Sequence, residues 1–180
     1  MSHSVANYFE LFGLSVDFQL DAQSLGQRYH ELARSTHPDR YANAPEPQRL
    51  RAIQLAVQVN EAFRVLQDPV SRARYLLELK GAVLNEESAT LADPQFLLEQ
   101  MELHEALGDV RTAQDPIEVL AQVGSRIQVR MGQLIHTLGN QLEADDLVPA
   151  HDTWRRLQFF RRLQQEADTL TAEIEDELDG

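Results

Sequence analysis

Apolar residues recur three and four positions apart along most of the chain, a spacing that predicts amphipathic helices. No stretch sustains the apolar–polar alternation of a strand, and β-branched residues are sparse. After a short opening segment, NYFELFGL, helices are predicted over 22–36, 47–67, from 69 to a stop at Gly81, and over 93–108, 115–139 and 145–178. The pattern therefore predicts an all-α fold.

The same pattern predicts which side chains face a core. In 47–67 the expected stripe consists of Leu50, Ile53, Val57, Asn60 or Ala62, and Leu66. In 145–178 it runs from Leu157 to Leu178, and the pair Gly139-Asn140 is expected to end the helix before it.

Residues 82–92, AVLNEESATLA, have no clear period and are predicted to be a linker. The predicted domains are therefore 1–81 and 93–180. Since the second domain holds three amphipathic helices with short connections, an antiparallel three-helix bundle is its expected architecture.

Composition excludes several classes of function. The chain of 180 residues has no cysteine, so it has no thiol nucleophile and no cysteine-bound zinc or iron–sulfur cluster. Its six histidines are scattered without a metal-binding spacing, and neither a metal nor another cofactor is predicted. No apolar run approaches the roughly 20 residues of a membrane span, and the start lacks the order of a secretory signal. The expected location is the cytoplasm.

Charge separates the two halves of the chain. The net charge is −13, yet residues 1–81 hold 9 of the 16 basic and 9 of the 29 acidic residues, so the whole acidic excess lies in 82–180. An acidic chain is a poor ligand for nucleic acid. The asymmetry favours two modules with different partners, and the alternative is that the acids only keep the second module soluble.

The sequence HPDR at 37–40 interrupts two predicted helices. His37 and Asp39 could form an acid–base pair, but no nucleophile or third partner accompanies them, so an enzyme is not expected. For the tripeptide alone, a simple turn is the more economical interpretation.

The surroundings of HPDR change that interpretation. The opening YFELFGL, Tyr29 eight residues before His37, and the stretch NEAFRVLQDPVSRARYLLELKG at 60–81 stand in the order found in J-domains. The first 80 residues therefore resemble a J-domain, the module that activates chaperone ATPases of the DnaK type. The resemblance implies a helical hairpin whose His-Pro-Asp loop docks on the chaperone.

The resemblance also implies a set of chaperone-binding residues: His37, Pro38, Asp39, Tyr29, Arg28 and Arg34. Asp39 would offer a carboxylate to a partner arginine, and Pro38 would reduce the entropy lost on docking. His37 would supply a donor, while the two arginines would face an acidic chaperone surface.

The segment 93–109, DPQFLLEQMELHEALGD, has two apolar faces. Phe96, Gln100, Leu103 and Leu107 share one face, and Leu97, Leu98 and Met101 form a second. The second face is either deeply buried or a partner site, which periodicity alone does not decide. The neighbouring acids favour a partner site, because an apolar centre with a charged rim is ordinary interface anatomy.

With FLLEQMELHEAL and WRRLQFFRRL, nearly the whole chain resembles the HscB family, the J-type co-chaperones of bacterial iron–sulfur cluster assembly. The resemblance implies two partners, an IscU-type scaffold protein and an HscA-type chaperone, and no catalytic chemistry. The implied scaffold-binding residues are Leu97, Leu98, Met101, Glu102, Glu105, Asp109 and Phe159.

Three alternatives stay open at this point: a J-protein with a different client, an enzyme that uses His37 and Asp39, and a helical adaptor with an inactive loop.

Overall fold

The structure is a computed structural model that describes residues 7–84 and 93–179, without the side chains of Pro38 and Asp179. Its elements are α1 (Tyr8–Leu11), α2 (Ala22–Thr36), η1 (Pro38–Tyr41), α3 (Glu46–Gln67), α4 (Pro69–Leu79), α5 (Pro94–Gly108), η2 (Val110–Thr112), α6 (Pro116–Glu143) and α7 (Leu147–Asp179). Within the described ranges there is no strand, so the predicted all-α fold is confirmed.

Contacts divide the chain into two units, 1–80 and 81–180. The predicted domain limits remain a prediction, and most of the predicted linker, 85–92, lies outside the described residues. None of the described helices is long and apolar enough to cross a membrane. Nor do the described residues include a group of three His, Asp or Glu side chains placed to hold a metal ion.

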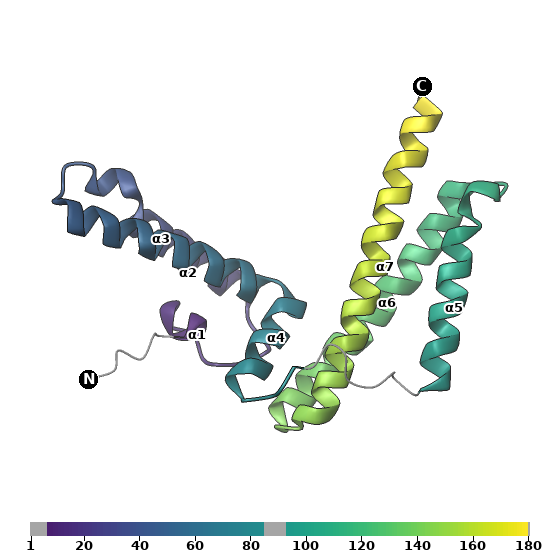
Figure 1. Cartoon of the computed structure of the whole chain (residues 1–180), viewed down its shortest axis with the longest axis horizontal. Coiled ribbons are helices and arrows are strands. Elements are labelled where there is room, and N and C mark those ends of the chain that lie inside the picture. Colours follow the sequence, from purple (N-terminus) through teal and green to yellow (C-terminus); the bar gives the residue numbers. More distant parts are fainter. Residues whose placement is uncertain (1–6, 85–92, 180) are drawn as a thin grey trace. The chain divides into compact units, whose positions relative to one another are not determined.

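The first unit is built on a hairpin in which α2 runs beside α3 (Figure 1). Local signals start its helices. Asn7 and Glu10 form a capping box on α1, and the Asp21 side chain accepts hydrogen bonds from two backbone N–H groups at the start of α2. The α1 ring of Tyr8 stacks on Tyr75 of α4 with centroids 4.4 Å apart, which closes the unit around buried Phe9.

The predicted core stripe of α3 is largely wrong. Leu50, Ile53 and Val57 are exposed, and Asn60 is exposed as well. The buried residues of α3 are Ala52, Val59, Ala62 and Leu66. The reason is that α1, α2 and α4 contact α3, and the side of α3 that is buried carries Ala52 and Ala62. Small alanines do not stand out in a hydrophobic pattern.

In the second unit, α6 and α7 pack along their length and α5 lies against α6 (Figure 1). The core consists mainly of Phe96, Leu103, Leu107, Leu120, Ile127, Leu138, Trp154, Leu157, Phe160 and Leu163. Asparagine and glycine do not end α6 as predicted, since Gly139 is buried inside the helix, which continues to Glu143. The chain reverses instead beside Asp145, the one described non-glycine residue with a positive φ, 59°.

The predicted stripe of α7 also stops early. Ile174 is the last buried residue of the helix, whereas Leu178 is exposed. In these last turns ion pairs replace apolar packing: Arg111 of η2 contacts Glu173 at 2.6 Å and Glu177 at 2.7 Å.

Candidate functional site

The loop after α2 is organised by its own side chains. Pro38 begins η1, where the missing N–H of proline costs nothing. The backbone N–H of Asp39 donates to Nδ1 of His37 at 3.3 Å. When Nδ1 accepts this bond, the neutral ring carries its N–H at Nε2, on an exposed side chain.

His37 and Asp39 do not form a buried catalytic pair. Their side chains are exposed, and Nδ1 lies 3.5 Å from the Asp39 carboxylate, a contact that would need Nδ1 to be protonated. That contact therefore excludes the backbone hydrogen bond to the same atom. The loop offers a donor and a carboxylate to solvent, which suits docking better than proton transfer.

The base of the loop is tied to the end of α2. The Thr36 hydroxyl donates to the carbonyl of Leu32 at 2.8 Å, and the Tyr41 hydroxyl donates to the carbonyl of Ser35 at 3.3 Å. The Tyr41 bond holds η1 against the last turn of α2, while the Thr36 bond lies within that turn, so the base of the loop is ordered.

Tyr29 has a structural role beside any docking role. Its ring stacks on Phe63 with centroids 4.0 Å apart, and its hydroxyl donates to Asn60 Oδ1 at 3.1 Å. The side chain is half-buried and links α2 to α3. Of the predicted chaperone-binding residues, Tyr29 is thus the one most engaged within the hairpin.

The two predicted arginines lie apart. Arg34 lines a shallow groove with His30, Ala33, His37 and Arg40. Arg28 lies elsewhere on α2, near Gly13. The sequence analysis did not identify His30 and Arg40 as part of this groove. His30 precedes Arg34 by four positions, so the two share a face of α2, and this spacing could have identified His30.

In the second unit, α5 turns its second apolar face to solvent. Leu97, Leu98 and Met101 are 40%, 57% and 69% exposed, while Phe96, Leu103 and Leu107 are buried on the other side. Within the second unit this face is therefore not buried, and its use as a partner site stays a prediction. We call Leu97, Leu98 and Met101 the α5 apolar surface.

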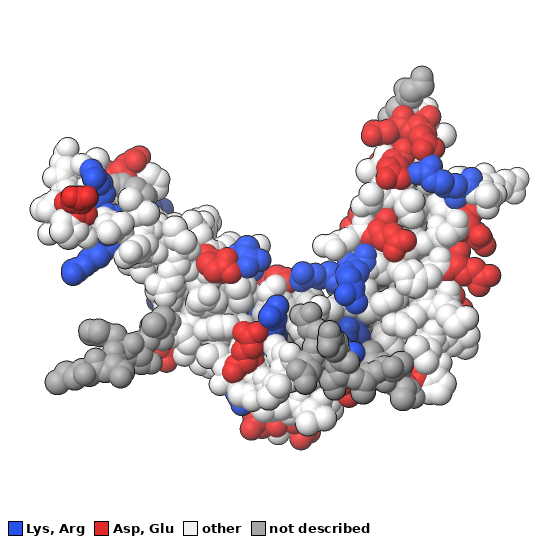
Figure 2. Space-filling view, in the orientation of Figure 1, with Lys and Arg blue, Asp and Glu red and all other residues white. Residues whose placement is uncertain are grey.

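Acidic side chains border the α5 apolar surface unequally. Glu102 contacts Arg126 of α6 at 3.3 Å, whereas Glu105 and Asp109 are exposed and make no ion pair with any described residue. Figure 2 shows acidic side chains gathered over the C-terminal halves of α5 and α7. Of the three predicted acids, only Glu102 forms an ion pair with a described residue.

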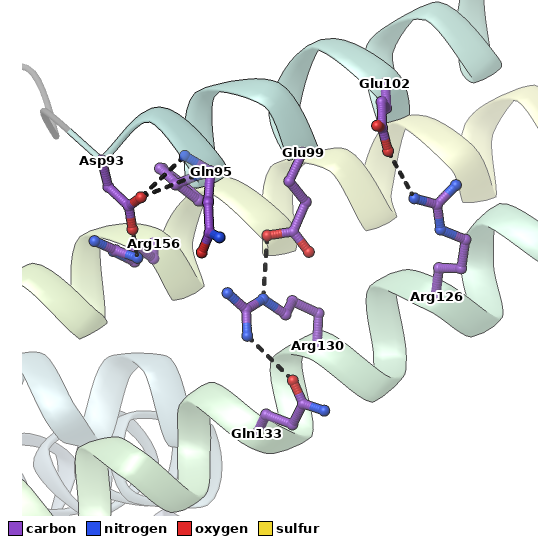
Figure 3. Close-up of polar contacts among 9 residues, drawn as sticks. Asp93, Gln95, Glu99, Glu102, Arg126, Arg130, Gln133 and Arg156 are labelled. Atoms are coloured by element: carbon purple, nitrogen blue, oxygen red, sulfur yellow. Dashed lines mark hydrogen bonds and ion pairs between the residues drawn. The ribbon is translucent and has the colours of Figure 1, made fainter.

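Three ion pairs fasten one flank of α5 (Figure 3). Besides Glu102–Arg126, they are Asp93–Arg156 at 2.8 Å and Glu99–Arg130 at 3.2 Å. The hydrogen bond from Arg156 is the main cause that lowers the pKa of Asp93 below its ordinary value. The two less exposed pairs, Asp93–Arg156 and Glu99–Arg130, fix the orientation in which α5 presents its apolar surface.

Phe159 of α7 lies at the other edge of α5. Its ring meets Phe96 and His104 edge-on, each with centroids 5.6 Å apart. Phe159 thus contacts His104, which follows Leu97 by seven positions and so lies on the same side of the helix. Sequence reasoning missed His104, and that spacing was the signal.

Comparisons with known proteins cover both units. Residues 7–75 match the family described as the DnaJ domain, and residues 92–168 match the family described as the HSCB C-terminal oligomerisation domain. A relative from Vibrio atlanticus, named co-chaperone protein HscB homolog, is 40% identical over 174 residues, which are 97% of this chain and 99% of the relative.

Solved structures give the same result. Chaperone HscB from Vibrio cholerae matches with a TM-score of 0.84 and 38% identity, over 96% of this chain and 99% of that one. Human co-chaperone protein HscB matches with a TM-score of 0.85 and 25% identity, over 93% of this chain and 83% of that one. With relatives at this identity along nearly its whole length, the chain belongs to the HscB family of J-domain co-chaperones.

Proposed function

We propose that this co-chaperone binds an IscU-type iron–sulfur scaffold through its second unit and delivers it to an HscA- or DnaK-type chaperone, whose ATPase it stimulates. The observation that carries the proposal is the α5 apolar surface. Three large apolar side chains stay exposed on a helix that already buries its other face. Soluble proteins rarely leave such a cluster uncovered unless a partner covers it.

The scaffold-binding residues of the proposal are the α5 apolar surface, the acids Glu102, Glu105 and Asp109, and Phe159 at the α7 edge. The apolar centre would supply most of the binding energy on desolvation. The acids would select a scaffold with basic residues around its contact and speed its approach.

The chaperone-binding residues of the proposal are His37, Pro38 and Asp39 in the loop, with Arg34 in the adjoining groove and Arg28 and Tyr29 on α2. An ordered loop with an exposed carboxylate and an exposed imidazole supports this assignment, since an arginine on the chaperone could pair with Asp39.

Joining both surfaces on one chain raises the local concentration of scaffold at the chaperone. Hydrolysis of ATP then takes place in the chaperone, locks it on its client and assists transfer of the cluster. This chain performs no covalent step, and with no cysteine it is not proposed to hold the cluster. We place this function in the bacterial cytoplasm, a location supported by relatives from Vibrio.

The test is steady-state ATP hydrolysis by an HscA-type chaperone with this protein, with and without an IscU-type scaffold. Stimulation is expected to rise synergistically with scaffold. His37→Gln is expected to abolish it, and the triple change L97A/L98A/M101A to abolish only the part that depends on scaffold.

Each failure points to a different error. If the protein stimulates the chaperone ATPase equally with and without scaffold, the J-domain function stands and the scaffold is not its client. Stimulation unaffected by His37→Gln would reject the loop, and ATP hydrolysis by this protein alone would favour an enzyme. A normal response of both variants would reject both interfaces.

A further inference from the structure

The three acids of the proposed scaffold site differ in how much charge they offer. Oε2 of Glu102 accepts a hydrogen bond from Nη2 of Arg126 at 3.3 Å, across the seam between α5 and α6 (Figure 3). Glu105 and Asp109 have no such partner among the described residues. The chain therefore neutralises one acid of its own binding surface and leaves the other two free.

The contact between Glu102 and Arg126 is easily exchanged. The two side chains are 52% and 55% exposed and share one hydrogen bond. Exposed pairs of this kind contribute little to folding, because water solvates both charges nearly as well. A cation from a binding partner could take the place of Arg126 on Glu102 without unfolding anything.

One turn further along α6, the pair of Arg130 with Glu99 is built differently. Its side chains are only 34% and 27% exposed, and Arg130 also donates to Gln133 at 3.1 Å. This pair holds the two helices together and does not reach the outward face of α5 (Figure 3). The chain thus places a fixed ion pair and an exchangeable one side by side, and the exchangeable one lies at the proposed site.

We propose that Arg126 is an intramolecular counter-ion that competes with a basic residue of the scaffold for Glu102. This competition lowers the affinity of the chain for the scaffold. The inference rests on the proposed function. Arg126 is a positioning residue here: it acts on the partner only through the carboxylate that it occupies. When the scaffold docks, the guanidinium moves into water and Glu102 accepts the incoming cation.

The experiment is calorimetric titration of an IscU-type scaffold into the full-length chain at low and at moderate salt. Arg126→Gln is expected to bind about two- to five-fold more tightly at low salt, the range that release of one exposed pair allows. The gain is expected to shrink at higher salt because screening weakens the freed charge.

Two further variants separate this competition from other causes. In a Glu102→Gln background, Arg126→Gln should bring no gain, because the carboxylate for which the two cations compete is absent. Arg130→Gln removes the same charge one turn away and should not tighten binding. Equal gains from both arginine variants, or a gain that persists without Glu102, would show a general charge effect and overturn the inference.

Leu98→Ala distinguishes failure of the inference from failure of the proposed function. If Leu98→Ala weakens binding while Arg126→Gln leaves it unchanged or weaker, the scaffold site stands and Arg126 is no competitor. If Leu98→Ala has no effect, or the wild-type chain does not bind the scaffold, the proposed site itself is wrong and the inference falls with it.

Discussion

Arg156 of α7 donates a 2.8 Å hydrogen bond to the carboxylate of Asp93, the residue that caps the N-terminus of α5. The same carboxylate accepts hydrogen bonds from the backbone N–H groups of Gln95 and Phe96. The Arg156 guanidinium also lies over the Phe96 ring, 5.0 Å from its centroid. One carboxylate thus fixes the start of the helix that carries the α5 apolar surface.

Replacing Asp93 should destabilise the second unit in a pH-dependent way. The pKa of Asp93 is lowered, chiefly by the hydrogen bond from Arg156. A carboxyl whose pKa is lower folded than unfolded stabilises the fold above its unfolded pKa, about 3.9, and loses this as the pH falls through the folded pKa. Asp93→Ala should therefore unfold at lower urea than wild type at pH 7, with a gap that closes in acid.

Asp93→Asn is the control, because asparagine can still cap the helix but carries no charge. Its urea midpoint at pH 7 should fall between those of wild type and Asp93→Ala. If the difference between wild type and Asp93→Ala were the same at pH 7 and in strong acid, the charge on Asp93 would contribute nothing.

Leu103 and Met101 lie two positions apart on α5 and should respond in opposite ways to alanine. Leu103 is 2% exposed, so Leu103→Ala should cost about 2–5 kcal/mol of unfolding free energy by leaving a cavity. Met101 is 69% exposed, so Met101→Ala should change it by less than about 0.5 kcal/mol.

Scaffold binding should also distinguish Met101 from Leu103. Met101→Ala should cost about 1–2 kcal/mol of binding free energy, as an anchor at the centre of an interface. Urea denaturation and titration calorimetry measure the two effects. A Met101→Ala protein that is as unstable as Leu103→Ala would show that Met101 supports the fold rather than a partner.

The two faces of α5 could be predicted because each repeats with the period of a helix and the residues that cap it are local in sequence. The stripe of α3 could not, since the choice between Leu50 and Ala52 depends on which side α2 approaches. In α3 the large apolar residues are exposed and small alanines are buried, which is the reverse of the pattern that usually marks a core-facing stripe.

Contacts between distant segments set a second limit on prediction. Arg126 reaches Glu102 across 24 positions, and Tyr29 reaches Asn60 across 31. Neither pairing follows from spacing along one helix, so the sequence predicted sites that include Glu102 and Tyr29 without predicting their intramolecular partners. Candidate site residues could be proposed from the sequence, but the ion pairs and hydrogen bonds that each makes within the fold could not.

Tyr29 should tolerate loss of its hydroxyl but not of its ring. Tyr29→Phe removes the exposed hydrogen bond to Asn60 and should cost less than about 1 kcal/mol of unfolding free energy. Tyr29→Ala removes the stack on Phe63 as well and should cost about 2 kcal/mol.

Chaperone stimulation should then show what Tyr29 contributes to docking. If its role is to hold α2 on α3, Tyr29→Phe should stimulate the chaperone ATPase like wild type. Loss of stimulation by Tyr29→Phe, with normal thermal unfolding, would instead mean that the chaperone reads the hydroxyl directly.

His104 should matter to scaffold binding through Phe159. The two rings meet edge-on with centroids 5.6 Å apart, and such aromatic pairs contribute about 0.5–1.5 kcal/mol. Because His104 is exposed, His104→Ala should lower the free energy of unfolding by no more than the contribution of this intramolecular pair, about 0.5–1.5 kcal/mol. The change also frees Phe159 and should weaken scaffold binding about three- to ten-fold. His104→Phe keeps a ring at this position and should restore most of the affinity. If His104→Ala binds like wild type while Phe159→Ala binds weakly, Phe96 alone positions Phe159 and the edge formed by His104 is not part of the interface.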